Sequence, residues 1–275
     1  MTLKIQILSE NYAYKTDLAE WGFSALIEFN GTKLLFDTGQ SGDCVIKNAK
    51  SLNVSLKDIG GIILSHGHYD HTEGLSKILT QIGDKKIYIH SDIFTKRYTV
   101  KDTKYENSNP FASLKNNPIL KGCPLIYCQD CFEISKNIYL VGDVPLGNSY
   151  ESISDYFVIK KGQTYIQDSF TDELSLVIEL PSGLLVITGC AHRGIINILS
   201  HIKNIFKKNI YGVIGGTHLH DATDERLNFV VNFLKEENIQ LIAPSHCTGM
   251  DKIFALKSIF LDKVKPSYCG ETYIL

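Results

Sequence analysis

Six consecutive residues of this chain combine three imidazoles with a carboxylate. The segment His66-Gly67-His68-Tyr69-Asp70-His71 directly follows a short apolar run at 62–64. Imidazole nitrogen and carboxylate oxygen are good zinc ligands, and a catalytic zinc site keeps at least one position open for water. In an extended or turning segment, His66 and His68 project to the same side and can share one ion. Asp70 and His71 fall in the turn that opens the next helix and can serve a second ion, so the spacing predicts a metal site here.

Two further histidines follow apolar runs that are typical of strands. His192 comes after residues 184–187, and His246 comes after residues 241–243. Open α/β sheets carry their ligand sites at the carboxyl ends of strands. Because a metal-type cluster is present elsewhere in the chain, we expect both histidines to be metal ligands.

Three other histidines are weaker candidates. His218 and His220 follow two glycines after another strand-like run, which suits a loop that closes on a substrate. Of this pair we assign His218 to substrate contact or proton donation. His90 ends the apolar run 87–90, and we interpret it as a structural residue at the end of a strand.

Two motifs resemble sites of other chemistry, but we assign neither of them that chemistry. The turn Asp37-Thr38-Gly39 resembles that of aspartic proteases, but those enzymes need two carboxylates that share a proton, and the chain has one such turn. We therefore expect Asp37 to orient a ligand imidazole. Cys123, Cys128 and Cys131 include a CxxC pair without a fourth cysteine at motif spacing, so we interpret them as ordinary thiols.

Composition excludes several classes of partner. With 28 basic and 30 acidic residues, the formal charge is −2, which gives no electrostatic reason to expect nucleic acid or anionic lipid. No stretch approaches the roughly 18 apolar residues that span a bilayer. The first six residues lack the apolar core of a secretion signal, and the seven cysteines fit a reducing compartment. These features predict a cytoplasmic protein with a small-molecule substrate and do not indicate an oligomeric state.

The hydrophobic pattern predicts an α/β fold. An Asn30-Gly31 hairpin signal lies early in the chain, and the second half repeats a strand-then-helix rhythm. Two sheets packed face to face with helices outside would form a four-layer αββα sandwich, which we expect as one domain over residues 1–275. Residues 95–122 are polar and proline-interrupted, and we interpret them as an irregular lid or insertion. Strands are predicted at 3–8, 23–29, 33–36, 62–64, 87–90, 125–127, 138–141, 175–180, 184–187, 211–214 and 241–243. Helices are predicted at 44–52, 73–82, 194–206, 225–235 and 252–264.

These motifs together resemble the metallo-β-lactamase superfamily. Residues 66–71 match its HxHxDH signature, and the resemblance extends over the whole chain. The combination of DTG, SHGHYDHTEGL, GCAHRGI, GGTHLH and HCTG resembles a subgroup described as metal-dependent hydrolases of β-lactamase superfamily II. That subgroup includes dihydropterin ribofuranosylaminobenzene phosphate synthases of methanopterin biosynthesis.

The resemblance implies an αββα sandwich with two metal sites. The first ion would be held by His66, His68 and a distal histidine, and the second by Asp70, His71 and His246. The chain departs from the family at two places: Cys190 stands where a bridging Asp is usual, and 141–145, with Asp143, replaces a Pro-Gly-His turn. We assign the distal ligand to His192, with Cys190 as an alternative bridge and Asp143 as an alternative ligand.

The expected activity is hydrolysis of a small phosphate- or ester-containing metabolite by a metal-activated water. Asp70 would orient the water and His218 would assist the leaving group. Zinc is the expected metal, two ions per chain, with manganese or iron able to use the same ligands. The alternative is a synthase or lyase that acts on a pterin-like or ring-phosphate substrate. A di-iron oxidoreductase is disfavoured, because such family members carry Glu at the position of His68 and a following flavodoxin-like domain, and a non-enzymatic metal-binding role is weaker still.

Overall fold

The computed structural model describes residues 2–14 and 18–275, so Met1, with which the predicted single domain begins, lies outside it. The chain divides into two compact units. Unit 1 comprises Met1–Tyr127, Ser154–Asp172 and Tyr268–Leu275, apart from the residues that the structure does not describe. Unit 2 comprises Cys128–Ile153 and Glu173–Ser267. The prediction of one domain over the whole chain stays a prediction.

Unit 1 is built on a mixed sheet with the strand order β17-β1-β2-β3-β4-β5-β8. Its strands are β1 (Leu3–Ser9), β2 (Ser24–Phe29), β3 (Thr32–Phe36), β4 (Gly61–Ile63), β5 (Lys86–Ile89), β8 (Leu125–Tyr127) and β17 (Thr272–Ile274). The predicted hairpin joins β2 to β3, and its Asn30 and Gly31 both have positive φ, at 52° and 81°. A type I′ turn requires positive φ at both central residues, which is why Asn-Gly was a reliable signal.

Two helices of unit 1, the first and the third, pack on one face of this sheet. The helices of this unit are α1 (Asp43–Ser51), α2 (Tyr69–Thr72) and α3 (Leu75–Ile82). Val45 of α1 and Ile78 of α3 share a buried apolar cluster with strand residues such as Leu35 and Ile62. The parallel strands β3, β4 and β5 end beside one another, so the residues that follow them gather at one edge of the sheet.

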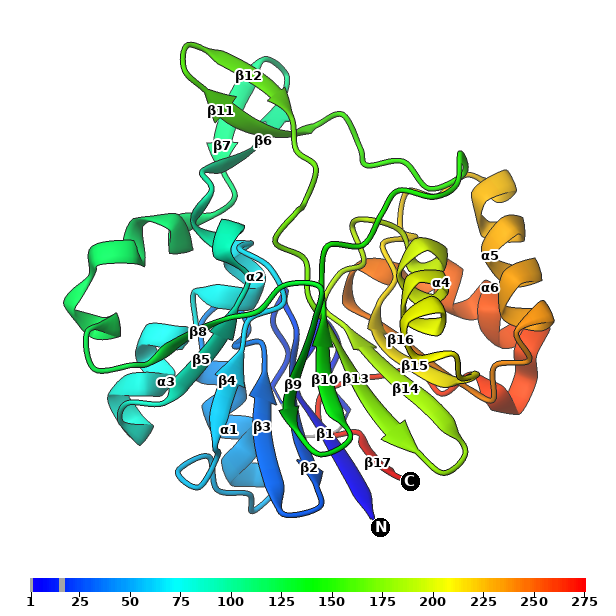
Figure 1. Ribbon diagram of the computed structural model, residues 1–275, viewed down its shortest axis with the longest axis horizontal. Coiled ribbons are helices and arrows are strands. Elements are labelled where there is room, and N and C mark those ends of the chain that lie inside the picture. Colours follow the sequence, from blue (N-terminus) through cyan, green and yellow to red (C-terminus); the bar gives the residue numbers. More distant parts are fainter. Residues whose placement is uncertain (1, 15–17) are drawn as a thin grey trace. The chain divides into compact units, whose positions relative to one another are not determined.

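The segment 95–122 contains regular structure, so the prediction that it is irregular is wrong. It forms β6 (Arg97–Lys101), β7 (Lys104–Asn107) and the 3₁₀ turns η2 (Pro110–Asn116) and η3 (Pro118–Leu120). The hairpin β6–β7 joins β11 (Phe157–Lys161) and β12 (Thr164–Gln167) in a small sheet (Figure 1). Every residue of β7 is exposed, so the strand lacks the apolar alternation that reveals half-buried strands. A lid role for this segment stays a prediction.

Unit 2 contains the second large sheet, ordered β16-β15-β14-β13-β10-β9. Its strands are β9 (Cys131–Ser135), β10 (Ile138–Val141), β13 (Ser175–Leu180), β14 (Gly183–Thr188), β15 (Ile210–Gly216) and β16 (Leu241–Ser245). The helices α4 (Ile195–Phe206), α5 (Asp224–Glu236) and α6 (Met250–Phe260) lie along it (Figure 1). Ile198, Val231 and Leu256 bring one helix each into a buried cluster with the strands. The parallel strands β14, β15 and β16 again end at one edge.

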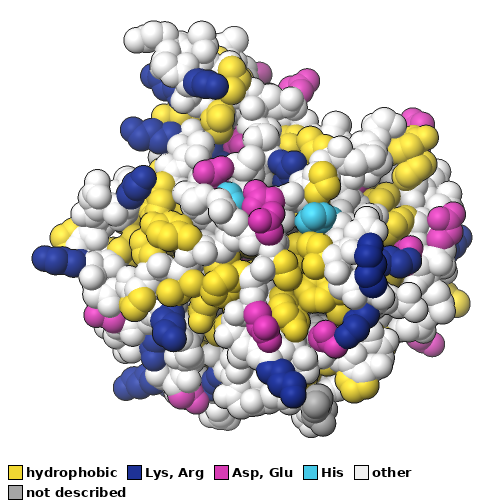
Figure 2. Space-filling view, viewed as in Figure 1, with side chains coloured by type: hydrophobic (Ala, Val, Ile, Leu, Met, Phe, Trp, Pro, Cys, Tyr) yellow, Lys and Arg dark blue, Asp and Glu magenta, His cyan; other side chains and the backbone are white. Residues whose placement is uncertain are grey.

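The distribution of charged side chains on the surface agrees with the near-neutral composition of the chain. On the face drawn in Figure 2, basic and acidic side chains are interspersed, and neither sign forms a continuous patch. No helix in the described part of the chain is long and apolar enough to cross a lipid bilayer.

Candidate metal centre

Three histidines of unit 1 meet in a buried cluster after β4. The ring centroid of His66 lies 4.3 Å from that of His71 and 4.8 Å from that of His68. Nε2 of His71 lies 3.9 Å from Oδ2 of Asp70. That distance is too long for a hydrogen bond, but it is shorter than about 4.2 Å, the sum of a zinc–nitrogen and a zinc–oxygen bond. The spacing therefore suits a cation held by both atoms.

Asp37 fixes the protons of two of these rings. Its carboxylate lies 2.7 Å from Nδ1 of His71 and also accepts hydrogen bonds from the backbone N–H and the hydroxyl of Ser65, each at 2.7 Å. Since the Ser65 hydroxyl donates to Asp37, it accepts from Nδ1 of His66, 2.9 Å away. This pattern favours the neutral tautomer in which both imidazoles carry their proton on Nδ1 and the lone pair is on Nε2. The contact predicted between Asp37 and a ligand imidazole is present.

Close packing holds the turn between His66 and His68. A Cβ on Gly67 would lie 2.3 Å from the side-chain nitrogen of Asn109 and 2.8 Å from the carbonyl oxygen of Ile93. The Asn109 amide is itself fixed, because it donates to the carbonyls of Ile93 and Thr95 at 2.8 and 2.7 Å. The segment 95–122 thus packs, through Asn109, against the turn of the histidine motif.

A buried ion network supports the same turn. Oδ2 of Asp172 accepts a hydrogen bond from the backbone N–H of Gly67 at 2.8 Å. Oδ1 of Asp172 pairs with Arg97 at 2.7 Å, and Arg97 also pairs with Asp168 at 2.7 Å. Burial raises the pKa of the Asp172 carboxyl to about 6, although the Arg97 guanidinium acts in the opposite direction. Buried charges of this kind are retained only where each is paired and hydrogen-bonded.

Unit 2 gathers histidines and thiols at the ends of β14, β15 and β16. The ring centroids of His192 and His218 are 4.4 Å apart. Cys190, His218 and Cys247 are buried, with ligand atoms that all lie within 4.8 Å of one another. Burial opposes ionisation of the Cys247 thiol, but hydrogen bonding with Cys190 and His218 lowers its pKa well below the usual range. These residues supply nitrogen and sulfur donors from three neighbouring strand ends.

Strained backbone marks the strand ends in both units. Asp37, Ala191, His218 and His246 have positive φ, at 57°, 61°, 49° and 49°. A non-glycine residue in this region costs on the order of 1–3 kcal/mol and persists only where its surroundings hold it. Such residues cluster at ligand sites, which agrees with the chemistry of the side chains found here.

Of the remaining candidates, two have structural partners and one lies beside His218. His90 ends β5, and its Nδ1 accepts a hydrogen bond from the backbone N–H of Asp92, as expected of a structural residue. His220 is exposed, its ring centroid lies 5.1 Å from that of His218, and the two histidines form a group of candidate ligands with Asp221. Asp143 is exposed and accepts a hydrogen bond from the backbone N–H of Asp130. Among the described residues, no group of candidate ligands contains the cysteines at 123, 128 or 131.

Sequence reasoning missed the residues that support the ligands. Ser65, Asn109, Asp172 and Glu173 contact the turns that carry the candidate ligands but match no ligand motif. The available signal was the acidic pair 172–173 directly ahead of the apolar strand β13. The six predicted ligands fall in two units, with positions 66, 68, 70 and 71 in unit 1 and positions 192 and 246 in unit 2. Their assembly into one centre stays a prediction.

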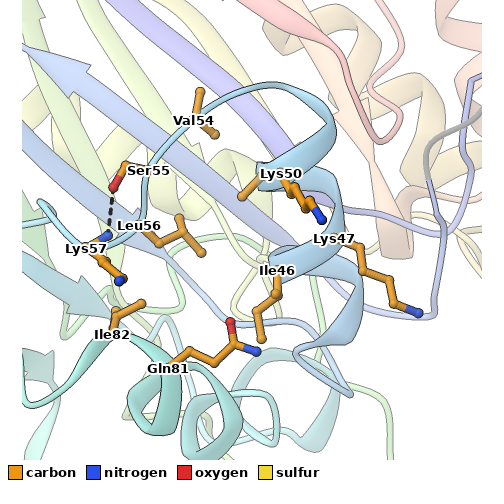
Figure 3. A pocket seen from close by; sticks show the side chains of 10 residues that line it. Ile46, Lys47, Lys50, Val54, Ser55, Leu56, Lys57, Gln81 and Ile82 are labelled. Atoms are coloured by element: carbon orange, nitrogen blue, oxygen red, sulfur yellow. Dashed lines mark hydrogen bonds between the residues drawn. The ribbon is translucent and has the colours of Figure 1, made fainter.

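A separate pocket of about 340 Å³ lies where α1 and α3 end (Figure 3). Ile46, Leu56 and Ile82 form its apolar wall, and Lys47 and Lys50 extend from α1 beside them. None of the predicted ligands or catalytic residues lines it, so it is not the predicted site.

Comparison with known proteins relates this chain to one superfamily. The model of the metallo-beta-lactamase superfamily matches residues 22–124. The chain is 34% identical to the protein MJ0448 of Methanocaldococcus jannaschii, over 93% of this chain and 94% of that one. It is 30% identical to 7,8-dihydropterin-6-methyl-4-(beta-D-ribofuranosyl)-aminobenzene-5'-phosphate synthase of the same organism, over 97% of this chain and 93% of that one.

A solved structure gives the same result for the fold. The crystal structure of Tm1679, a metal-dependent hydrolase of the β-lactamase superfamily, aligns with a TM-score of 0.84 and 30% identity, covering 98% of each chain. The predicted metallo-β-lactamase-like α/β fold class is therefore confirmed.

Proposed function

The chain belongs to the metallo-β-lactamase superfamily, and from that premise we propose that it is a hydrolase with two divalent metal ions, zinc in our assignment. Its substrate is a small phosphate- or ester-containing metabolite. The observation that carries the proposal is the hydrogen-bond network of Asp37 and Ser65, which engages Nδ1 of both His66 and His71 and so favours the tautomer that binds metal through Nε2.

The donor set fits zinc or a similar transition metal. Unit 1 contributes His66, His68, Asp70 and His71, and we propose that His192 and His246 of unit 2 complete the two sites. His192 would join His66 and His68 at the first ion, and His246 would join Asp70 and His71 at the second. Three imidazoles suit the first ion, whereas a carboxylate and two imidazoles suit the second. Manganese or iron could use the same ligands.

When bound by these residues, a divalent ion would supply Lewis-acid chemistry that activates water for attack near neutral pH. Asp70 then orients the attacking water and receives its proton at a carboxylate oxygen. His218 gives a proton to the leaving group, a role suited to a buried imidazole in a loop beside His192. Burial of these groups limits access of bulk water and strengthens each electrostatic contact.

One observation favours a second candidate, a synthase acting on a pterin-like or ring-phosphate substrate. The relative at 30% identity carries the name of a synthase whose product contains a dihydropterin and a ribose 5'-phosphate. The two candidates differ in whether the enzyme breaks a bond with water or forms one between two substrates.

The experiment combines metal analysis with a substrate panel. Purified protein should contain between one and two transition-metal ions per chain, and chelation should abolish turnover of whichever phosphomonoester, phosphodiester, lactone or thioester is hydrolysed. Full hydrolytic activity in metal-free protein would refute the proposal. Bond formation between a pterin-like acceptor and a ring phosphate, without net hydrolysis in the panel, would support the synthase instead.

A further inference from the structure

Two acidic residues that are neighbours in the chain belong to different units. Asp172 is the last residue of one segment of unit 1, and Glu173 is the first residue of the next segment of unit 2. Both side chains are buried, with exposed fractions of 0% and 3%. A buried carboxylate is costly unless it accepts strong hydrogen bonds, so the partners of these two residues show what they do.

Asp172 holds the turn that carries the first ligands. Oδ2 accepts from the backbone N–H of Gly67 at 2.8 Å, and Gly67 lies between the ligand positions 66 and 68. Oδ1 is anchored on its other side by Arg97 at 2.7 Å. The carboxylate touches the main chain of the ligand turn, so its effect on the imidazoles passes through the backbone.

Glu173 holds the ligand turn of unit 2 in the same manner. Oε1 accepts from the backbone N–H of His192 at 2.6 Å, and Oε2 accepts from that of Arg193 at 2.9 Å. Both oxygens are therefore directed at the main chain around one predicted ligand. The preceding residue, Ala191, is held at a φ of 61°, a conformation that needs such support.

We propose that the dipeptide Asp172-Glu173 is a positioning element that holds one ligand turn in each unit and links the two anchors by a single peptide bond. This inference rests on the proposed function, in which both turns serve one metal centre. Adjacent Cα atoms are fixed at about 3.8 Å, so a shift of one anchor is transmitted to the other. Metal affinity then depends on the integrity of the dipeptide, although neither carboxylate is itself assigned as a ligand.

The first experiment replaces each carboxylate by its amide. Asp172→Asn and Glu173→Gln keep the side-chain shape but weaken the acceptor, and each should weaken zinc binding by about 10- to 100-fold, the usual effect of losing a partner outside the ligand set. Binding is measured by competition against a zinc chelator of known affinity.

One matched control is available. Glu151→Gln removes a buried carboxylate that accepts from the backbone N–H groups of Ile196 and Asn197, at the start of α4. This control should destabilise the fold and leave zinc affinity within about threefold of the wild type.

The second experiment tests the link itself. Inserting one glycine between Asp172 and Glu173 keeps every side chain but lengthens the connection by up to about 3.8 Å. We expect the metal content to fall from two ions per chain to one or none. A glycine inserted after Gly162, in the turn between β11 and β12, is the control and should leave metal content unchanged. If the variant with a glycine between Asp172 and Glu173 binds two ions with wild-type affinity, the proposed link between the two turns is wrong.

A readout that needs no metal separates this inference from the proposed function. Hydrogen exchange of the Gly67 amide should accelerate in Asp172→Asn, and exchange of the His192 and Arg193 amides in Glu173→Gln, by at least tenfold over the control. If the wild type binds no divalent metal, the proposed function fails, and amide exchange still decides whether the dipeptide holds the turns. Equal amide exchange in the substituted and control proteins would refute the positioning role. This test remains available if the insertion variant does not fold.

Discussion

Replacing Asp37 by asparagine tests whether the partners of the ligand histidines determine metal binding. The carboxylate receives three donors at 2.7 Å: the Ser65 backbone N–H, the Ser65 hydroxyl and Nδ1–H of His71. An asparagine has one acceptor oxygen and an NH₂ group, so at least one donor meets another donor. The Ser65 hydroxyl can rotate, but the His71 ring can accept at Nδ1 only by moving its proton to Nε2.

That proton move removes a metal ligand. Nε2 of His71 is the atom that lies 3.9 Å from Oδ2 of Asp70, and once protonated it offers no lone pair. We therefore expect Asp37→Asn to weaken the second ion more than the first. Loss of such a partner typically lowers metal affinity 10- to 100-fold. That range corresponds to about 1.4–2.7 kcal/mol.

The assay is equilibrium dialysis against buffered zinc, followed by elemental analysis of the protein. Two ions per chain in the wild type should fall toward one in Asp37→Asn at a free zinc concentration that saturates both wild-type sites. Backbone strain does not confuse the result, because asparagine tolerates the φ of 57° found at this position. Ser24→Ala is a matched control, since Ser24 donates to the backbone carbonyl of Asp37 and leaves its carboxylate intact. Unchanged affinity for both ions in Asp37→Asn would refute the reasoning.

Four further substitutions address the candidate ligands and the turn that carries the first two of them. Asp70→Asn should keep much of the first ion but lose most turnover, because the amide is a poor ligand and a poor proton acceptor; an equal loss of thermal stability and activity would mark Asp70 as structural. His192→Ala should release metal, whereas Cys190→Ser should release less, and the reverse order in elemental analysis would indicate a thiolate ligand instead. Gly67→Ala should lower thermal stability by about 1–3 kcal/mol, because its Cβ would lie 2.3 Å from Asn109, and calorimetry that finds no change would contradict the packing argument.

The sheets were predictable because their strands are short apolar runs. Residues 62–64 and 241–243 indicated β4 and β16, and Asn30-Gly31 fixed the β2–β3 hairpin. The small sheet was missed, since strands such as Lys104–Asn107 are exposed on both faces and carry no period-2 pattern. Strand β9 escaped notice for a similar reason, as its residues are half-buried or exposed throughout.

The candidate ligands could be predicted, but their partners could not. A histidine motif or a histidine after an apolar strand is visible locally, within a few residues. The hydrogen bond from Gly67 to Asp172 joins positions 105 residues apart, and that from Ser65 to Asp37 joins positions 28 apart. Such bonds depend on the tertiary fold and leave no spacing signature. Asp37 was an exception, because a turn directly after β3 places it at the edge where β4 also ends.

The partners fall into two kinds that control different properties of the ligands. Asp37 contacts an imidazole and a hydroxyl, so it sets which ring nitrogen carries the proton. Asp172 and Glu173 contact backbone N–H groups, so they set where a turn lies. A carboxylate suits both tasks, because it accepts from several donors and offers none. Strained backbone at Ala191, beside the amide that Glu173 holds, indicates that the turn would relax without this support. Substitution of an acidic partner is thus expected to weaken metal binding by about 10- to 100-fold, which is less than the loss expected when a candidate ligand is removed.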